Sequence, residues 1–224
     1  MKSYTPLLAG GLTAALLCIS WTASAGGGVI SAEAASVVHA RPANSSDARG
    51  RQLATLESYL MADTVTVGLA PGDQTGWQAN SIQRGIRIWA DSIPDCPFTL
   101  VDPGQKPMIV VKFVNSIESG GDIQGQVEAI RSLRWGASVS YKISGTLLVR
   151  LNTGNHELKE DELSEVVAHE LGHVLGLDDA TDCVGLMGPF VPGRPRLAPS
   201  KGEVKAVEDY RAQLRQEIAK LQNK

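Results

Sequence analysis

The sequence predicts an α+β fold, because its expected elements follow in the order strand, helix, strands, helix, helix. Apolar residues alternate with a period of two from about residue 65, and helical spacing recurs in three later segments. The chain has 224 residues, of which 43% are hydrophobic and 20% charged, and this composition is typical of a globular domain. We assign the domain to 62–222.

Charge and hydropathy exclude two classes of partner. The formal net charge of −3 gives no strong electrostatic case for binding nucleic acid or an anionic membrane surface. No apolar run reaches the roughly 18–20 residues that cross a bilayer, so we expect no integral membrane span.

The chain begins with a targeting pattern. Lys2 precedes an apolar run over 7–19, and Ala23-Ser24-Ala25 has the small residues of a cleavage site. We therefore predict a signal peptide over 1–25 and a secreted protein, either extracellular or periplasmic. The alternative interpretation of this run is a short buried helix.

The segment 26–61 is poor in large apolar residues and is predicted to be a flexible leader or pro-like segment. Leu53, Leu56 and Leu60 could form a short amphipathic helix near its end.

The first half of the domain alternates strands with one helix. The apolar residues of 65–69 predict a strand, and the spacing from Trp77 to Ile93 predicts a helix that Pro94 ends. Two further strands are expected over 98–101 and 108–114. The glycine-rich stretch 115–127 is expected to be a surface loop. After it, 137–143 alternates like an edge or hairpin strand, and 146–151 is a further apolar strand.

The second half contains two predicted helices. Acidic residues over 160–162 precede an apolar stripe, and Gly176 suits the C-terminal cap. Ser200 and Glu203 form a capping box for the last helix after a Gly/Pro-rich loop. The stripe of the first helix is Leu163, Val166, Val167, Leu171, Val174 and Leu175.

The first of these helices contains His169-Glu170-Leu171-Gly172-His173, an H-E-x-x-H pattern. Residues i and i+4 share a helix face, so the two imidazoles can bind one zinc ion. Glu170 lies about 100° further around the helix and can reach a zinc-bound water, whose pKa falls to roughly 7. This arrangement predicts Glu170 as the general base.

The pattern continues to Gly176 and Asp179 as H-E-x-x-H-x-x-G-x-x-D, and Met187 follows within Gly-Leu-Met-Gly-Pro. Here the sequence resembles the metzincin zinc endopeptidases, especially their matrixin-like branch. The resemblance implies that Asp179 is the third zinc ligand, in the place of the family's histidine. Asp178 and Asp182 are the rival ligands. The resemblance also implies that Met187 forms an apolar floor beneath the zinc site.

The resemblance covers 62–222 in pattern, although only 169–189 is highly specific. It implies a twisted mixed sheet with an antiparallel edge strand, an active-site helix, a Met-turn and a C-terminal helix. It also implies that a peptide substrate pairs with the edge strand, expected within 137–143, and that 188–193 walls the pocket beyond the scissile bond. No propeptide cysteine resembling the family's cysteine switch is found between 26 and 95.

These features predict a secreted, monomeric zinc endopeptidase. Zn²⁺ would bind His169, His173 and Asp179, and Glu170 would activate the attacking water. One alternative is a secreted zinc-binding module of the same fold that binds a partner without catalysis. Another is a structural or envelope-associated protein in which the motif is a coincidence.

Cys96 and Cys183 remain after removal of the signal peptide. An even pair in an exported chain predicts one disulfide, and the alternative is two separate free thiols.

Overall fold

The computed structural model describes residues 30–38, 46–70, 76–102, 104–118, 123–135, 139–181 and 184–223. The predicted signal peptide at 1–25 lies outside the described residues, as do Asp182 and Cys183.

Five strands form one sheet in the order β2-β1-β3-β5-β4. The four parallel strands are β1 (Val65–Leu69), β2 (Phe98–Leu100), β3 (Ile109–Val114) and β5 (Val139–Arg150). The fifth, β4 (Gly125–Trp135), pairs antiparallel with β5 at the edge. A short ribbon of β6 (Asn152–Thr153) and β7 (His156–Glu157) follows β5. The α+β class is therefore confirmed, with a mostly parallel sheet.

The segment 137–143 was expected to be an edge or hairpin strand, and the hairpin interpretation is confirmed for its described residues. Strand β5 joins residues 139–143, which pair antiparallel with β4, to residues 146–150 of the next predicted strand. The pairing of β3 with β5 begins at Gly145, and the last strand in the sheet order is β4. Part of the expected loop 115–127 belongs to β4. Gly145 lies where the two predicted strands meet, and a side chain there would contact the carbonyl oxygen of Glu128 on β4. Its role is thus close strand packing rather than a strand break.

One arginine explains why β4 was missed. Val127, Ala129 and Arg131 alternate along the same side of the strand, and Arg131 interrupts the apolar pattern. Its guanidinium lies on the helix-covered face, where Nη2 donates to the carbonyl of Val174 at 2.9 Å. A charged residue on an inner face hides the period-two signal of a strand.

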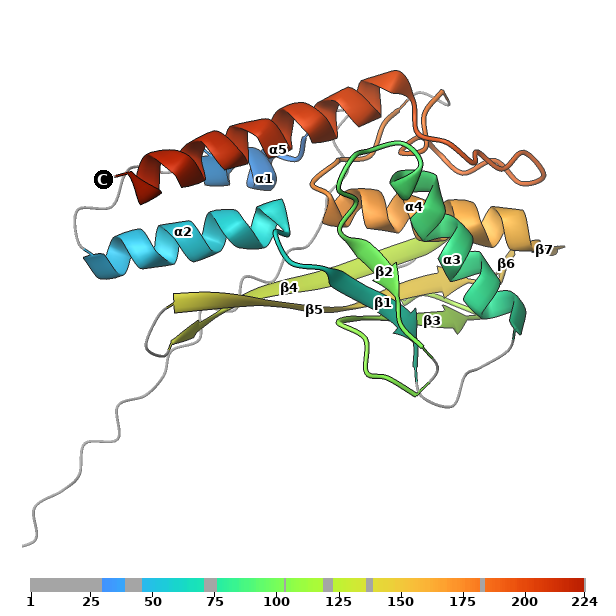
Figure 1. The fold of residues 1–224 in the computed structure, drawn as a ribbon. Helices are drawn as coiled ribbons and strands as arrows, with labels where there is room; N and C mark the ends of the chain where they lie inside the picture. The colour runs from blue at the N-terminus through green and yellow to red at the C-terminus, as the bar shows by residue number, and fades with distance from the viewer. Residues whose placement is uncertain are drawn as a thin grey trace, which may run out of the picture.

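The helices lie on one face of the sheet (Figure 1). Helices α3 (Gly76–Ala90) and α4 (Glu160–Val174) pack directly together, and the indole Nε1 of Trp89 donates to the carbonyl of Ala168 at 2.7 Å. Helix α5 (Lys201–Gln222) ends the chain. All three helices were predicted. The core between α3, α4 and the sheet includes Ile82, Trp89, Ile109, Leu147, Val167 and Leu171.

The segment 26–61 differs from the expected flexible leader. Its described part forms α1 (Ala32–Val38) and α2 (Ser46–Leu60), and both lie against α5 (Figure 1). Leu56 and Leu214 are completely buried in a second apolar core between these helices. The predicted amphipathic stripe is thus confirmed, but it extends the fold instead of ending a flexible segment. Removal of this segment as a pro-region stays a prediction.

Among the described residues, no helix combines the length and the apolar character that a membrane span requires.

Candidate metal centre

Helix α4 places the two histidines of the motif one turn apart. The ring centroids of His169 and His173 are 4.9 Å apart, with the ring planes at 85°. Each imidazole is oriented by the backbone: Nδ1 of His169 lies 2.9 Å from the carbonyl oxygen of Leu186, and Nδ1 of His173 lies 3.0 Å from that of Leu177. Because a carbonyl only accepts, Nδ1 is the donor and Nε2 faces the site.

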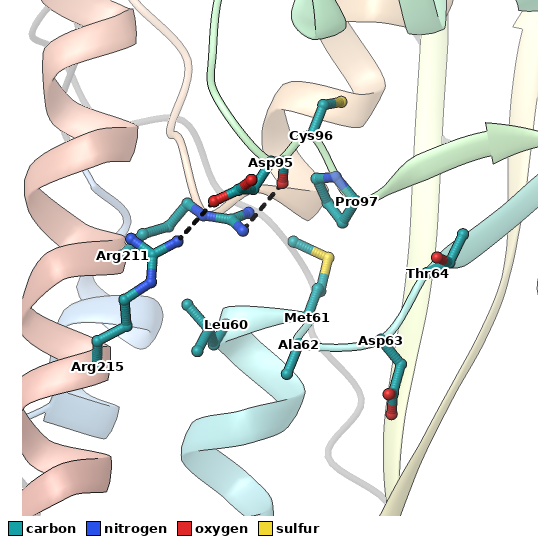
Figure 2. A pocket seen from close by; sticks show the side chains of 10 residues that line it. All are labelled: Leu60, Met61, Ala62, Asp63, Thr64, Asp95, Cys96, Pro97, Arg211 and Arg215. Carbon is teal, nitrogen blue, oxygen red and sulfur yellow. Dashed lines mark hydrogen bonds and ion pairs between the residues drawn. The ribbon is translucent and has the colours of Figure 1, made fainter.

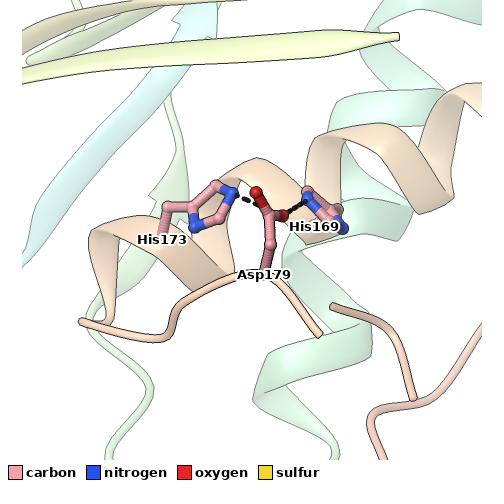
Figure 3. Close-up of side chains that lie close together, drawn as sticks. All are labelled: His169, His173 and Asp179. Atoms are coloured by element: carbon pink, nitrogen blue, oxygen red, sulfur yellow. Dashed lines mark hydrogen bonds and ion pairs between the residues drawn. The ribbon is translucent and has the colours of Figure 1, made fainter. Parts of the chain in front are cut away.

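A sharp turn after α4 brings the third residue back to the histidines. Gly176 has φ +100°, which a side chain would disfavour, and its N–H donates to the carbonyl of His173 at 3.0 Å. Asp179 then lies beside both rings (Figure 3). Its Oδ1 is 3.0 Å from Nε2 of His169 and 3.4 Å from Nε2 of His173.

The three groups could hold one metal ion. Their ligand atoms all lie within 4.8 Å of one another. Ligand atoms 2.0–2.2 Å from a tetrahedral ion are themselves about 3.3–3.6 Å apart, close to the two measured separations. Two imidazoles and one carboxylate form a ligand set that zinc accepts, although other divalent cations also bind such a set. The three residues can therefore bind zinc, but they do not discriminate zinc from other divalent cations.

The structure places one of the rival ligands elsewhere. The carboxylate of Asp178 accepts from the N–H of Asp179 at 3.0 Å and stabilises the turn. It is not part of the cluster of His169, His173 and Asp179. Asp182 lies outside the described residues, so its exclusion stays a prediction.

Asp179 and His173 stabilise each other's charged forms. Hydrogen bonds, first from His169 and then from His173, lower the pKa of Asp179. Burial alone would lower the pKa of His173, but the hydrogen bond to Asp179 and the charge of Glu170 raise it to about 9. A cation bound at Nε2 would take the place of that proton, so metal binding and proton release are coupled here.

Glu170 is buried beside the cluster, with a relative exposure of 4%. Burial raises the pKa of its carboxyl, and the backbone of Val127 on β4 forms a hydrogen bond to it. A side chain at Gly125 would contact Oε1 of Glu170, so the beginning of β4 lies against this carboxylate. A carboxylate with a raised pKa next to a metal-binding cluster can accept a proton and return it.

Met187 lies directly beneath the motif and is completely buried. A side chain at Gly172 would contact the Sδ of Met187 and the ring of Trp89. The carbonyl of Met187 accepts from the N–H of Ala180 at 2.8 Å, next to Asp179. The residue expected to form the apolar floor therefore packs against the helix between the two histidines.

Two buried carboxylates that fix this loop were missed by the motif analysis. Glu203 on α5 accepts from the N–H groups of Leu186 at 3.0 Å and Met187 at 2.7 Å. Its sequence signal was only that of a capping box, and the structure confirms that box at Ser200. The carboxylate thus caps α5 and holds the Met187 turn at the same time.

The second missed carboxylate is Glu165 on α4, which accepts from Nε of Arg196 at 2.7 Å. The same guanidinium donates to the carbonyls of Gly185 at 2.7 Å and Pro189 at 2.6 Å. Spacing could not reveal this interaction, because 31 residues separate the two partners. An ion pair between the partly buried Arg196 and the buried Glu165 therefore ties the loop after Met187 to the motif helix.

Cys96 is half-buried and forms no disulfide with any residue that the structure describes, and burial raises the pKa of its thiol. Its expected partner Cys183 lies outside the described residues, so the disulfide stays a prediction.

No family model matches this chain, and no curated protein shows significant similarity to it.

Proposed function

We propose that this chain is a secreted zinc-dependent endopeptidase of the metzincin type, close to the matrixin-like branch. One observation carries the proposal. The ligand atoms of His169, His173 and Asp179 lie within 4.8 Å of one another, and the buried Glu170 comes between the two histidines in the sequence of the same helix. Support also comes from the order of the elements, since a mostly parallel sheet with an antiparallel edge strand precedes the motif helix.

His169, His173 and Asp179 would hold the zinc through two Nε2 atoms and one carboxylate oxygen. When bound, zinc supplies a Lewis acid that polarises the scissile carbonyl and makes water easier to deprotonate. Glu170 takes the proton of the attacking water at its carboxylate and delivers it to the leaving amine nitrogen. The raised pKa of Glu170 suits both steps, because the carboxyl must be able to retain the proton between them.

The substrate would bind along β4 rather than 137–143. One side of β4 pairs with β5, and the other is the edge of the sheet, so an extended peptide can add to it as a further strand. Gly125 at the beginning of β4 lies against Glu170, and a peptide that pairs with this strand would pass the proposed base. The loop 188–193 remains the proposed wall of the pocket beyond the scissile bond.

The proposal is tested with Glu170→Gln and Glu160→Gln, two isosteric changes on α4. Glu160 has an exposed carboxylate near Arg84 and serves as the control. Purified wild type and both variants should contain about one zinc per chain by mass spectrometric metal analysis. On a peptide library, Glu170→Gln should lose at least about a hundredfold in kcat/KM, since general base catalysis contributes roughly 10²–10⁴-fold. Full cleavage by Glu170→Gln would contradict the mechanism.

A zinc-binding module without catalysis is the second candidate. The burial of Glu170 and its hydrogen bond to Val127 favour it, because both reduce the access of water to the carboxylate. This function predicts stoichiometric zinc and no cleavage of any library peptide by wild-type protein. Absence of zinc from wild type would exclude both candidates.

A further inference from the structure

The N-terminal part of the fold contacts the turn between the second and third proposed ligands. Ile30 forms an isolated antiparallel bridge with Leu177. The N–H of Ser31 donates to the carbonyl of Gly176 at 2.8 Å. The first described residues of the chain are therefore hydrogen-bonded to the turn that follows the motif helix.

Gly176 and Leu177 are connected directly to two of the proposed ligands. The carbonyl of Leu177 accepts from Nδ1 of His173 at 3.0 Å, which orients the ring, and Asp179 follows two residues later. Gly176 has φ +100°, and this conformation directs the chain back toward the histidines. A displacement of the turn would therefore move both the imidazole of His173 and the carboxylate of Asp179.

Helix α1 holds Ser31 against the turn. Ser31 and Ala34 are buried, and the hydroxyl of Ser31 accepts from the N–H of Ala34 at 3.3 Å at the start of the helix. The hydroxyl of Tyr210 on α5 donates to the carbonyl of Ala34 at 3.0 Å. A side chain at Gly176 would contact both Ala34 and the ring of Tyr210, so α1 and α5 pack against the turn.

Two further contacts fix these helices to the rest of the domain. The hydroxyl of Tyr59 on α2 donates to the carboxylate of Glu33 on α1 at 2.7 Å. Arg211, the residue after Tyr210, donates from Nη2 to the carbonyl of Asp95 at 3.1 Å, beside the pocket where α2, the turn before β2 and α5 meet (Figure 2). Helix α1 is thus held by α2 and by α5, and α5 is held by the turn before β2.

We propose that Ile30 and Ser31 are positioning residues of the metal centre. By holding the turn at 176–177, they place the imidazole of His173 and the carboxylate of Asp179. Hydrogen bonds that orient a ligand typically contribute roughly 10–100-fold to metal affinity. The proposal rests on the proposed metal site and does not require peptide cleavage. It implies that these residues belong to the mature domain and not to a removable pro-region.

Ser31→Pro and Ser31→Ala form a matched pair. Both variants lose the hydroxyl that caps α1, but only proline also removes the N–H that donates to Gly176. Ser31→Pro should bind zinc about tenfold more weakly than Ser31→Ala, the lower end of the effect of an orienting hydrogen bond. Competition with a chromogenic chelator measures both affinities. Ser36→Ala removes an exposed hydroxyl of the same helix, which donates to the carbonyl of Glu33, and should bind zinc as wild type does.

Hydrogen exchange of the histidine ring protons separates positioning from a general loss of stability. It is measured by NMR on ¹⁵N-histidine-labelled protein as purified. Nδ1–H of His173 is bonded to the turn at Leu177, whereas Nδ1–H of His169 is bonded to Leu186 in another loop. Relative to Ser31→Ala, Ser31→Pro should accelerate exchange at His173 by about tenfold and at His169 by less than about twofold. General destabilisation would accelerate both.

Tyr210→Phe keeps the buried ring and loses the hydroxyl that binds α1, so it should weaken zinc binding by about threefold. The proposal is overturned if Ser31→Pro and Ser31→Ala bind zinc equally, or if exchange at His173 accelerates no more than at His169. If Ser31→Pro does not fold, unchanged zinc binding and unchanged His173 exchange in Tyr210→Phe overturn it. Absence of zinc from wild type would contradict the proposed function, and the exchange comparison would then decide the positioning role alone.

Discussion

Gly172 illustrates at the scale of one residue why the motif helix needs its particular sequence. It occupies the second variable position of H-E-x-x-H, where many residues would maintain a helix. In the structure a Cβ at this position would overlap the Sδ of Met187 and approach the ring of Trp89. Glycine therefore allows the Met187 turn to approach the helix closely.

Gly172→Ala should lower the free energy of unfolding by about 1–3 kcal/mol, because the added methyl overpacks this contact. Gly202→Ala is the matched control, since its Cβ would meet only Ser200 Oγ at 3.8 Å in the first turn of α5. That change should be neutral or stabilise by up to about 1 kcal/mol. Urea denaturation of both variants gives the comparison, and equal effects at the two glycines would contradict the packing argument.

The ligand assignment also depends on single residues. Asp179→Ala should weaken zinc binding by more than the roughly 10–100-fold that loss of an outer hydrogen-bond partner costs. Asp178→Ala should keep the affinity within about tenfold, because its carboxylate accepts from the backbone N–H of Asp179 and is not part of the metal-binding cluster. Competition with a chromogenic chelator measures both. Loss of zinc in Asp182→Ala with retention in Asp179→Ala would show that the third ligand is misassigned.

At the scale of an element, the beginning of α4 is fixed by one buried carboxylate. Glu162 accepts from the N–H of Lys159 at 2.8 Å and the N–H of Gly193 at 2.7 Å, and Nε2 of His156 lies 2.8 Å away. Burial acts to raise the pKa of Glu162, but these hydrogen bonds together lower it below its usual range. Glu162 thus joins the helix start to the β6–β7 ribbon and to the loop after Met187.

The lowered pKa of Glu162 determines how its contribution to stability changes with pH. A carboxyl with a lower pKa in the folded protein stabilises it above the unfolded value of about 4.3, and the contribution disappears as pH falls through the folded pKa. Glu162→Gln should cost about 1–3 kcal/mol near pH 7, and the difference from wild type should shrink below about pH 4. Denaturation from pH 3 to 7 measures it. A constant difference would show that the ionised form is not what stabilises α4.

The elements that the sequence predicted well are those with an uninterrupted pattern. Helices α3, α4 and α5 have apolar stripes and boundaries that the sequence marks clearly. Pro94 follows the end of α3, Gly176 follows the end of α4, and Ser200 precedes the start of α5. Strand β4 was missed because Arg131 occupies an inward position, and β5 was divided at Gly145, whose reason for being glycine is the neighbouring strand. Such reasons depend on tertiary contacts that local periodicity does not contain.

The candidate site shows the same division. His169, Glu170 and His173 could be predicted from helical spacing alone. Gly176 indicates the turn that brings Asp179 back to the histidines. Glu203 and Arg196 do not follow, because their partners are the backbone groups of a distant loop. Motif spacing therefore predicts the groups that could bind metal, whereas the groups that position the loop require the fold.

The whole molecule has two apolar cores that share α5. One lies between the sheet, α3 and α4 and includes Val207 of α5. The other lies between α1, α2 and the rest of α5. Arg131 connects them: its Nη2 donates to Val174 on α4, and its guanidinium lies 4.3 Å from the ring centroid of Tyr59 on α2. The helices of 32–60 are thus packed as part of the same fold.

Leu56→Ala should therefore reduce the free energy of unfolding by about 2–5 kcal/mol, as expected for a completely buried leucine. Leu197→Ala, at a site that is 41% exposed, should change it by no more than about 0.5 kcal/mol. Both values come from denaturant titration followed by tryptophan fluorescence. A negligible effect at Leu56 would mean that α2 contributes nothing to the stability of the domain.

The turn after α4 is hydrogen-bonded from both directions of the chain. Ser31 donates its N–H to the carbonyl of Gly176 at 2.8 Å, and the carboxylate of Glu203 binds the N–H of Met187. During synthesis, the ribosome therefore releases the metal-binding motif before the residue that fixes its loop. The contact between Ser31 and Gly176 joins residues far apart in the sequence, and such contacts form slowly, because the intervening chain must first be ordered. Metal competence should consequently appear late in folding and report that the C-terminal helix has docked.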